Sequence, residues 1–66
     1  MSATKNFIEE KIGEYAEKYS VKENDLMDTF NIMNILGISF GFNDMEEKLM
    51  RCYHLFKYIQ IDENDK

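Results

Sequence analysis

The sequence predicts an all-α fold: a small three-helix bundle with helices over roughly residues 4–19, 21–36 and 44–60, completed by homodimerisation. Apolar residues recur at helical spacing in each of these three segments. Glycine and short polar stretches separate the segments, and the chain contains no proline. The stretch from Gly37 to Phe42 alternates like a strand, but the sequence offers no second strand to pair with it.

The first segment carries an apolar stripe that predicts one helix. Ser2 or Thr4 could cap its beginning. Gly13 lowers helix propensity by roughly 1 kcal/mol, but the stripe continues on both sides of it, so we expect the helix to continue. The stripe consists of Ile8, Ile12, Tyr15, Ala16 and Tyr19.

The second segment has a clear start signal and a clear stop signal. Ser20 and Glu23 have the spacing of a capping box, in which each side chain bonds a free backbone N–H of the other residue. Gly37 followed by Ile38 predicts a Schellman stop, where glycine takes the left-handed conformation. The apolar arc between them consists of Leu26, Phe30, Ile32, Met33 and Leu36.

The third segment predicts the longest helix. Asn43 and Asp44 form a polar cap, and Glu46 follows at the third position after Asn43. Residues 61–66 are polar, so we expect this end to fray. One domain over residues 1–66 is the most that so short a chain can form. The apolar face of the third helix consists of Met45, Leu49, Cys52, Tyr53, Phe56 and Ile59.

The residues of these stripes, together with Leu55, are the predicted core. A core of this size only narrowly offsets the conformational entropy that the chain loses on folding. A second copy would supply further apolar burial, which is why we expect a homodimer.

Several apolar or aromatic side chains lie outside the stripes. Met50, His54 and Tyr58, for example, follow one another at four-residue steps on the outer side of the third helix. Methionine and aromatic residues are enriched at protein interfaces. Phe40 and Phe42 have an alternative role as a lid that folds back over an open end of the bundle. The candidate interface consists of Phe7, Met27, Ile35, Phe40, Phe42, Met50, His54 and Tyr58.

The charge and the cysteine content limit which classes of partner and which cellular compartment we expect. Thirteen acidic residues against eight basic ones give a formal charge of −5, which argues against binding to nucleic acid. Neither a signal peptide nor a run of about 18 apolar residues is present, so we expect no membrane partner. The single cysteine, Cys52, fits a reducing compartment, and we expect a cytoplasmic protein.

The sequence predicts no enzyme, cofactor site or metal site. Cys52 and His54 diverge on a helix, so they cannot act together as nucleophile and base. One cysteine and one histidine cannot form the usual zinc site in a monomer. The acidic runs also lack the glycine and terminal glutamate of a calcium-binding loop.

These observations favour a small protein-protein interaction module, such as an adaptor, regulator or inhibitor. It would bind a partner protein, and a second copy of itself, through exposed apolar residues. Frequent isoleucine, asparagine and lysine are typical of AT-rich genomes, such as those of some bacteria and phages. The alternative is a dimeric helix-turn-helix-like regulator that binds DNA, although Glu46 and Glu47 would bring negative charge to the phosphates.

Overall fold

The computed structural model describes residues 3–64, and side chains are described for residues 6–59. Within residues 3–64 the chain forms three helices, α1 (Ala3–Tyr19), α2 (Glu23–Leu36) and α3 (Met45–Asn64). No strand occurs within residues 3–64. The predicted all-helical fold with three helices is therefore confirmed, and α3 is the longest of them.

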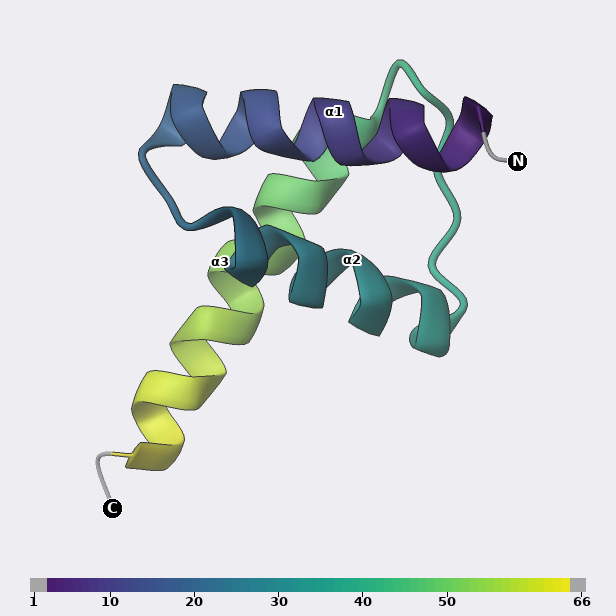
Figure 1. Ribbon diagram of the computed structural model, residues 1–66. Coiled ribbons are helices and arrows are strands. Elements are labelled where there is room, and N and C mark those ends of the chain that lie inside the picture. The colour runs from purple at the N-terminus through teal and green to yellow at the C-terminus, as the bar shows by residue number, and fades with distance from the viewer. Residues whose placement is uncertain (1–2, 65–66) are drawn as a thin grey trace.

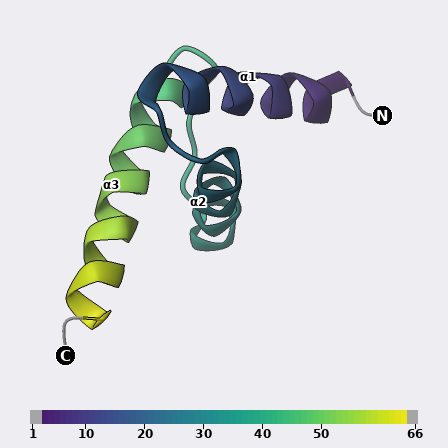
Figure 2. The ribbon, with the colours of Figure 1, turned by 60° about the vertical axis from the view of Figure 1, so that its left-hand side comes forward.

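The helices form an open corner. α1 and α3 lie at a large angle to each other, and α2 occupies the space between them (Figures 1 and 2). α2 packs against both of the other helices. The second half of α3 extends beyond α1 and α2, which gives the molecule an elongated shape of 43 × 26 × 20 Å (Figure 1).

The turn between α1 and α2 corrects the predicted capping box. Ser20 takes a left-handed conformation with φ 58°. Its N–H donates to Glu17 O at 3.4 Å, and the Val21 N–H donates to Ala16 O at 3.0 Å, as in a Schellman motif. A helix N-cap requires extended backbone angles. Ser20 therefore ends α1, and Lys22 occupies the N-cap position of α2 without a side-chain cap.

The end of α2 is the stop that the sequence predicts. Gly37 has φ 77°, its N–H donates to Asn34 O at 3.1 Å, and the Ile38 N–H donates to Met33 O at 2.9 Å. These bonds satisfy carbonyls that would otherwise lack a partner at the helix end. α2 ends where predicted because glycine adopts this conformation without strain.

The remaining helix ends differ slightly from the prediction. Thr4 lies inside α1, so it is not its N-cap, and Ser2 lies outside the described residues. The Lys48 N–H donates to Asp44 O at 3.0 Å, which places Asp44 at the start of α3 as expected. α3 continues to Asn64 instead of ending near residue 60, since no glycine or proline interrupts the polar segment. Residues 65 and 66 lie outside the described residues.

The core lies where the three helices meet. Fully buried side chains from all three helices form its centre, and Thr29 is buried beside them. The Thr29 hydroxyl donates to Asp25 O at 2.9 Å, which satisfies this polar group within its own helix. The central apolar residues are Ile12, Leu26, Met33, Met45 and Leu49.

Part of the predicted core is exposed. The second half of α3 extends beyond α1 and α2, so apolar residues on it have no neighbouring helix to cover them (Figure 1). The predicted core residues found exposed are Tyr19, Ile32, Leu36, Leu55 and Ile59.

Within residues 3–64, no helix is long and apolar enough to cross a membrane.

Candidate functional site

The large apolar side chains that stay exposed are concentrated at two places. Ile32, Ile35 and Leu36 form the first group, which we call the α2 triad, and Leu55, Tyr58 and Ile59 form the second, the α3 triad. The six side chains are between 38% and 81% exposed. Each triad has the i, i+3, i+4 spacing that places side chains side by side on a helix.

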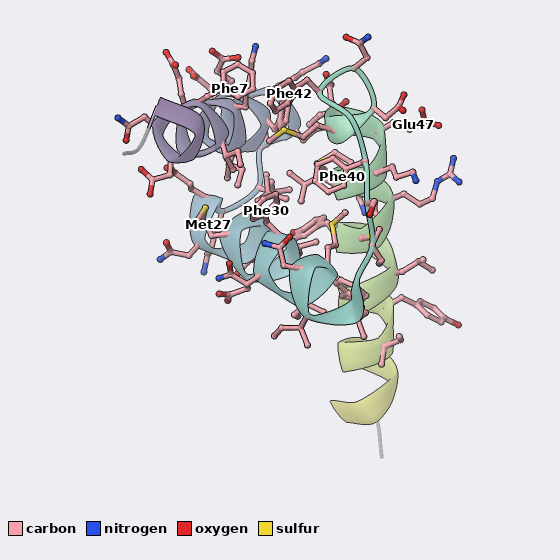
Figure 3. The ribbon with its side chains drawn as sticks, turned by 90° about the vertical axis from the view of Figure 1, so that its right-hand side faces the viewer. Phe7, Met27, Phe30, Phe40, Phe42 and Glu47 are labelled. Carbon is pink, nitrogen blue, oxygen red and sulfur yellow. The ribbon has the colours of Figure 1, made fainter. Side chains whose placement is uncertain are left out.

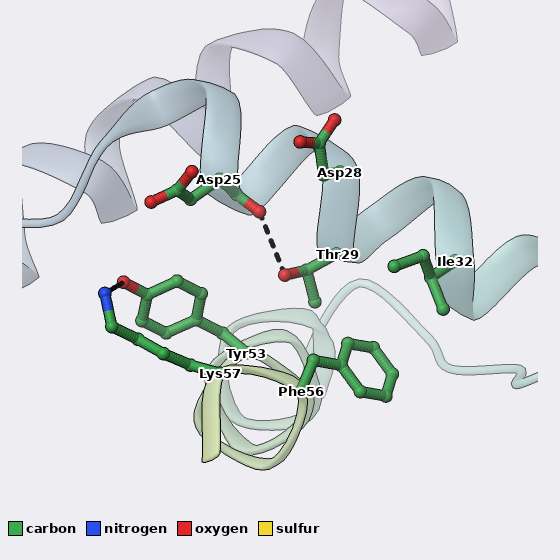
Figure 4. Close-up of a pocket in the computed structure, with 7 residues that line it drawn as sticks. All are labelled: Asp25, Asp28, Thr29, Ile32, Tyr53, Phe56 and Lys57. Carbon is green, nitrogen blue, oxygen red and sulfur yellow. Dashed lines mark hydrogen bonds between the residues drawn. The ribbon is translucent and has the colours of Figure 1, made fainter. Parts of the chain in front are cut away.

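Phe56 lies between the two triads. It lines a small groove of about 80 Å³ between α2 and α3, and Ile32 lines the same groove (Figure 4). Phe56 also lies three residues before Ile59, so the two side chains are neighbours on α3. The groove thus joins one triad to the other through a half-buried aromatic ring.

The opposite end of the groove is polar. Asp25 and Asp28 line it from α2, and Tyr53 and Lys57 line it from α3 (Figure 4). Lys57 Nζ lies 3.5 Å from the Tyr53 hydroxyl and 5.7 Å from the centre of its ring. The combination of an apolar end and a polar rim is typical of the edge of a protein interface.

The connection between α2 and α3 brings two phenylalanines back to the bundle. The Phe40 ring lies 6.0 Å from the Phe30 ring, and the Phe42 ring lies 4.9 Å from the Phe7 ring, both edge to face (Figure 3). Phe40 is half-buried against the core, whereas Phe42 stays 67% exposed. The lid hypothesis therefore describes Phe40 better than Phe42.

The eight predicted interface residues divide into three groups by exposure. Met50 is 6% exposed and belongs to the core, so its predicted outward direction was wrong. Phe7, Met27 and Phe40 are half-buried. The residues that remain exposed are Ile35, Phe42, His54 and Tyr58.

Met50 is buried because α3 has neighbours on two sides. Leu49 and Tyr53 lie in the core, while Glu46, one turn before Met50, bonds to the end of α1. The sequence analysis assumed that the third helix buries only one face, and it therefore missed the second contact, on the side that carries Met50.

The apolar surface contains four residues that the sequence analysis assigned to the core: Ile32, Leu36, Leu55 and Ile59. Two signals could have identified two of them. Leu55 lies outside the apolar stripe of its helix, and Leu36 directly precedes the helix stop at Gly37. No comparable signal distinguishes Ile32 and Ile59, which fit their stripes.

A polar cluster ties α1 to the start of α3. Lys18 Nζ and the Tyr19 hydroxyl both donate to Glu46 Oε2, each at 2.6 Å. These bonds hold the pKa of Glu46 below its usual value, and they raise the pKa of Lys18 and of Tyr19. The cluster therefore joins the last turn of α1 to the first turn of α3.

The α3 triad has charged neighbours on the same helix. Arg51 Nη2 lies 3.0 Å from Glu47 Oε2, and both side chains are 70% exposed. Lys48 Nζ donates to Ser39 O at 3.2 Å.

His54 is exposed, and its ring packs edge to face against Tyr53 at 5.3 Å. Cys52 is a half-buried free thiol.

Among the described residues, no three histidine, cysteine, aspartate or glutamate side chains gather where they could hold a metal ion. Comparison of the chain with known protein families, curated proteins and solved structures found no match. The candidate site is the exposed apolar surface formed by the two triads.

Proposed function

We propose that the chain is a small protein-protein interaction module, an adaptor, regulator or inhibitor, which binds other protein molecules through the α2 and α3 triads. A second copy of the chain is one of these molecules, and the setting is the reducing cytoplasm. One observation carries the proposal. Among residues 6–59, the large hydrophobic side chains found exposed all belong to the two triads, apart from Tyr19 and Phe42.

The free energy of apolar burial supports this proposal. Fully burying one leucine or isoleucine side chain contributes about 1.5–3 kcal/mol. The six triad side chains are between 38% and 81% exposed, so covering them adds part of this free energy for each, which favours binding against the entropy cost of association. Tyrosine also suits such a role, because it combines a large apolar ring with a polar hydroxyl.

The second half of α3 gives a further reason. It extends beyond the other two helices (Figures 1 and 2). Isolated helices shorter than about 12–15 residues are only marginally stable in water. A partner that covers the α3 triad would stabilise this half of the helix by tertiary contact.

Photocrosslinking tests the proposal. A photoreactive phenylalanine analogue replaces Ile35 in one variant and the exposed Glu10 of α1 in a control variant. We expect position 35 to form a covalent adduct with a particular protein in extracts of the native host, and position 10 to form none. Equal labelling from both positions, or none from position 35, would contradict the proposed use of the α2 triad.

The helix-turn-helix alternative makes a different prediction. It requires binding to mixed-sequence duplex DNA that weakens steeply as salt concentration rises. Glu46 and Glu47 in the first turn of α3 oppose such binding. A salt-dependent DNA complex at low ionic strength would favour the alternative over the protein-binding module.

A further inference from the structure

The groove between α2 and α3 has two carboxylates at its polar end. Asp25 is half-buried and Asp28 is exposed, and both line the groove from α2 (Figure 4). Among the described side chains, neither carboxylate forms an ion pair or a hydrogen bond. Their spacing of three residues makes the two side chains neighbours on the helix. This end of the groove therefore favours a positively charged group.

The α3 wall of the groove already holds a positive charge against an aromatic ring. Lys57 Nζ lies 5.7 Å from the centre of the Tyr53 ring (Figure 4). The negative face of an aromatic ring attracts a cation at this distance. Lys57 is exposed and forms no ion pair with another described side chain, so an incoming cation can displace it.

Arginine fits this end of the groove better than lysine does. Its planar guanidinium group stacks on aromatic rings and binds two carboxylate oxygens at once. The groove has a volume of about 80 Å³, whereas small-molecule sites usually measure about 300–1,000 Å³. It therefore suits one side chain of a larger partner. The formal charge of −5 on the whole chain attracts a basic partner as well.

The apolar end of the groove adds a second requirement. Ile32 lies seven residues after Asp25, which is about 10 Å along a helix. Ile32 is exposed, and the half-buried Phe56 lines the groove beside it. A partner segment thus needs an apolar side chain about two helical turns from its arginine. An amphipathic helix lying in the groove meets both requirements.

A second copy of the chain does not supply this arginine. The sequence contains one arginine, Arg51. At 3.6 residues per turn, Arg51 lies on the other side of α3 from Tyr53 and Phe56, which line the groove. Copies that placed Arg51 in one another's grooves would form an open chain instead of a closed dimer. The occupant that fits the groove is a different protein.

We propose that the α2–α3 groove binds an arginine of a basic amphipathic helix in a partner protein, between the Asp25 and Asp28 carboxylates and the Tyr53 ring. An apolar residue of the same helix covers Ile32 and Phe56. The inference rests on the proposed function, because it specifies the chemistry of the partner that binds beside the two triads.

Fluorescence anisotropy with a designed peptide tests the inference on the purified full chain. The probe is a labelled amphipathic peptide of about 18 residues, which is long enough to form a helix. Leucines form its apolar face, and one arginine stands at each end of the leucine row, so either direction of binding brings an arginine to Asp25. In the matched peptide, citrulline replaces both arginines, which removes the charge and keeps the shape.

We expect the arginine peptide to bind with a dissociation constant of roughly 1–100 μM. The citrulline peptide should bind about three- to tenfold more weakly, because it loses the charge-assisted hydrogen bonds.

Variants on the two walls of the groove should act in opposite directions. Asp25→Asn should weaken binding of the arginine peptide about three- to tenfold and leave the citrulline peptide unchanged. Lys57→Gln should strengthen binding of the arginine peptide about two- to fivefold, because it removes a competing cation. Glu10→Gln removes a negative charge from an exposed position on α1 and should change neither affinity by more than about twofold. Circular dichroism confirms that each variant retains its helices.

Three results would overturn the inference. They are equal affinity for the two peptides, no binding of the arginine peptide up to about 1 mM, and weaker self-association of the Asp25→Asn variant in sedimentation equilibrium. The last result would assign the groove to a second copy of the chain.

The proposed function is tested separately, because Ile35 does not line the groove. A crosslink from position 35 to another protein would stand even if the peptides bound equally. Conversely, a preference for arginine that depends on Asp25, together with no crosslink from position 35, would support the groove site and refute the proposed use of the α2 triad.

Discussion

Ser20 holds a backbone conformation that serine rarely adopts. Its φ of 58° lies in the left-handed region, where a side chain costs roughly 1–2 kcal/mol. Glycine has no such cost but loses more conformational entropy on folding. The Schellman bonds of the α1 end need the conformation and do not use the side chain.

We therefore expect Ser20→Gly to raise the free energy of unfolding by roughly 0.5–1 kcal/mol. Urea denaturation followed by circular dichroism measures the change. Ser20→Val is the matched control and should destabilise the chain, because a β-branched side chain is strained at positive φ. An unchanged or lower stability in the glycine variant would mean that the serine hydroxyl contributes a contact.

Ser20 and Gly37 also show what local sequence can predict. Both residues end a helix through the same pair of backbone bonds. A glycine in the sequence predicts this left-handed position after a helix end, because glycine adopts positive φ freely. Serine is far more common as an N-cap, and Glu23 lies at the spacing of a capping box. The sequence therefore predicts that Ser20 begins α2, whereas it ends α1.

At the scale of the helices, Glu46 links the end of α1 to the start of α3. Its lowered pKa arises from the hydrogen bonds of Lys18 and Tyr19. A carboxylate with a lowered pKa in the folded state stabilises that state above its unfolded pKa, near 4.5. This contribution disappears as the pH falls through the lower folded value.

We expect Glu46→Gln to lower the melting temperature at pH 7, because the neutral amide cannot replace the carboxylate. The difference from wild type should shrink below pH 4.5 and vanish in stronger acid. Thermal scans across acidic pH measure this difference. Glu47→Gln, which removes the neighbouring carboxylate outside the cluster, should show a smaller effect at pH 7. A pH-independent difference would indicate that Glu46 acts by packing alone.

Leu49 and Leu55 provide a matched comparison within α3. Leu49 is fully buried, whereas Leu55 is 55% exposed. Leu49→Ala should cost roughly 2–5 kcal/mol, because it opens a cavity in the core. At concentrations where the chain is monomeric, Leu55→Ala should cost about 0.5 kcal/mol or less. Denaturation of both variants at low concentration checks this, and equal costs would show that Leu55 is covered within one chain.

Helix positions were easier to predict than the faces that the helices bury. The existence and order of α1, α2 and α3 follow from apolar periodicity, which is a local property. Met50 and Ile59 were misplaced because burial depends on where the neighbouring helices cross. Met50 lines the same hollow as Tyr19 of α1 and Glu46, and it is buried, whereas Ile59 is exposed on the half of α3 that extends beyond its neighbours.

At the scale of the whole molecule, the open corner explains both the core and the candidate surface. The core forms where the three helices cross, so residues near the crossing are buried. The second half of α3 extends beyond this crossing (Figure 2) and carries the α3 triad, whereas the α2 triad lies on α2 beside the buried Met33. A single copy therefore leaves apolar side chains in water that a second protein molecule can cover.

Hydrogen exchange tests this central claim most directly, because it reports how well each part of α3 is protected. Amides are followed from residue 45 to residue 64 in the purified chain across a range of concentrations. We expect exchange from about Leu55 to Asp62 to be fast at low concentration and to slow markedly as dimers form. Amides near Leu49 should be protected already in the monomer. Exchange in the second half of α3 that is independent of concentration would contradict the claim.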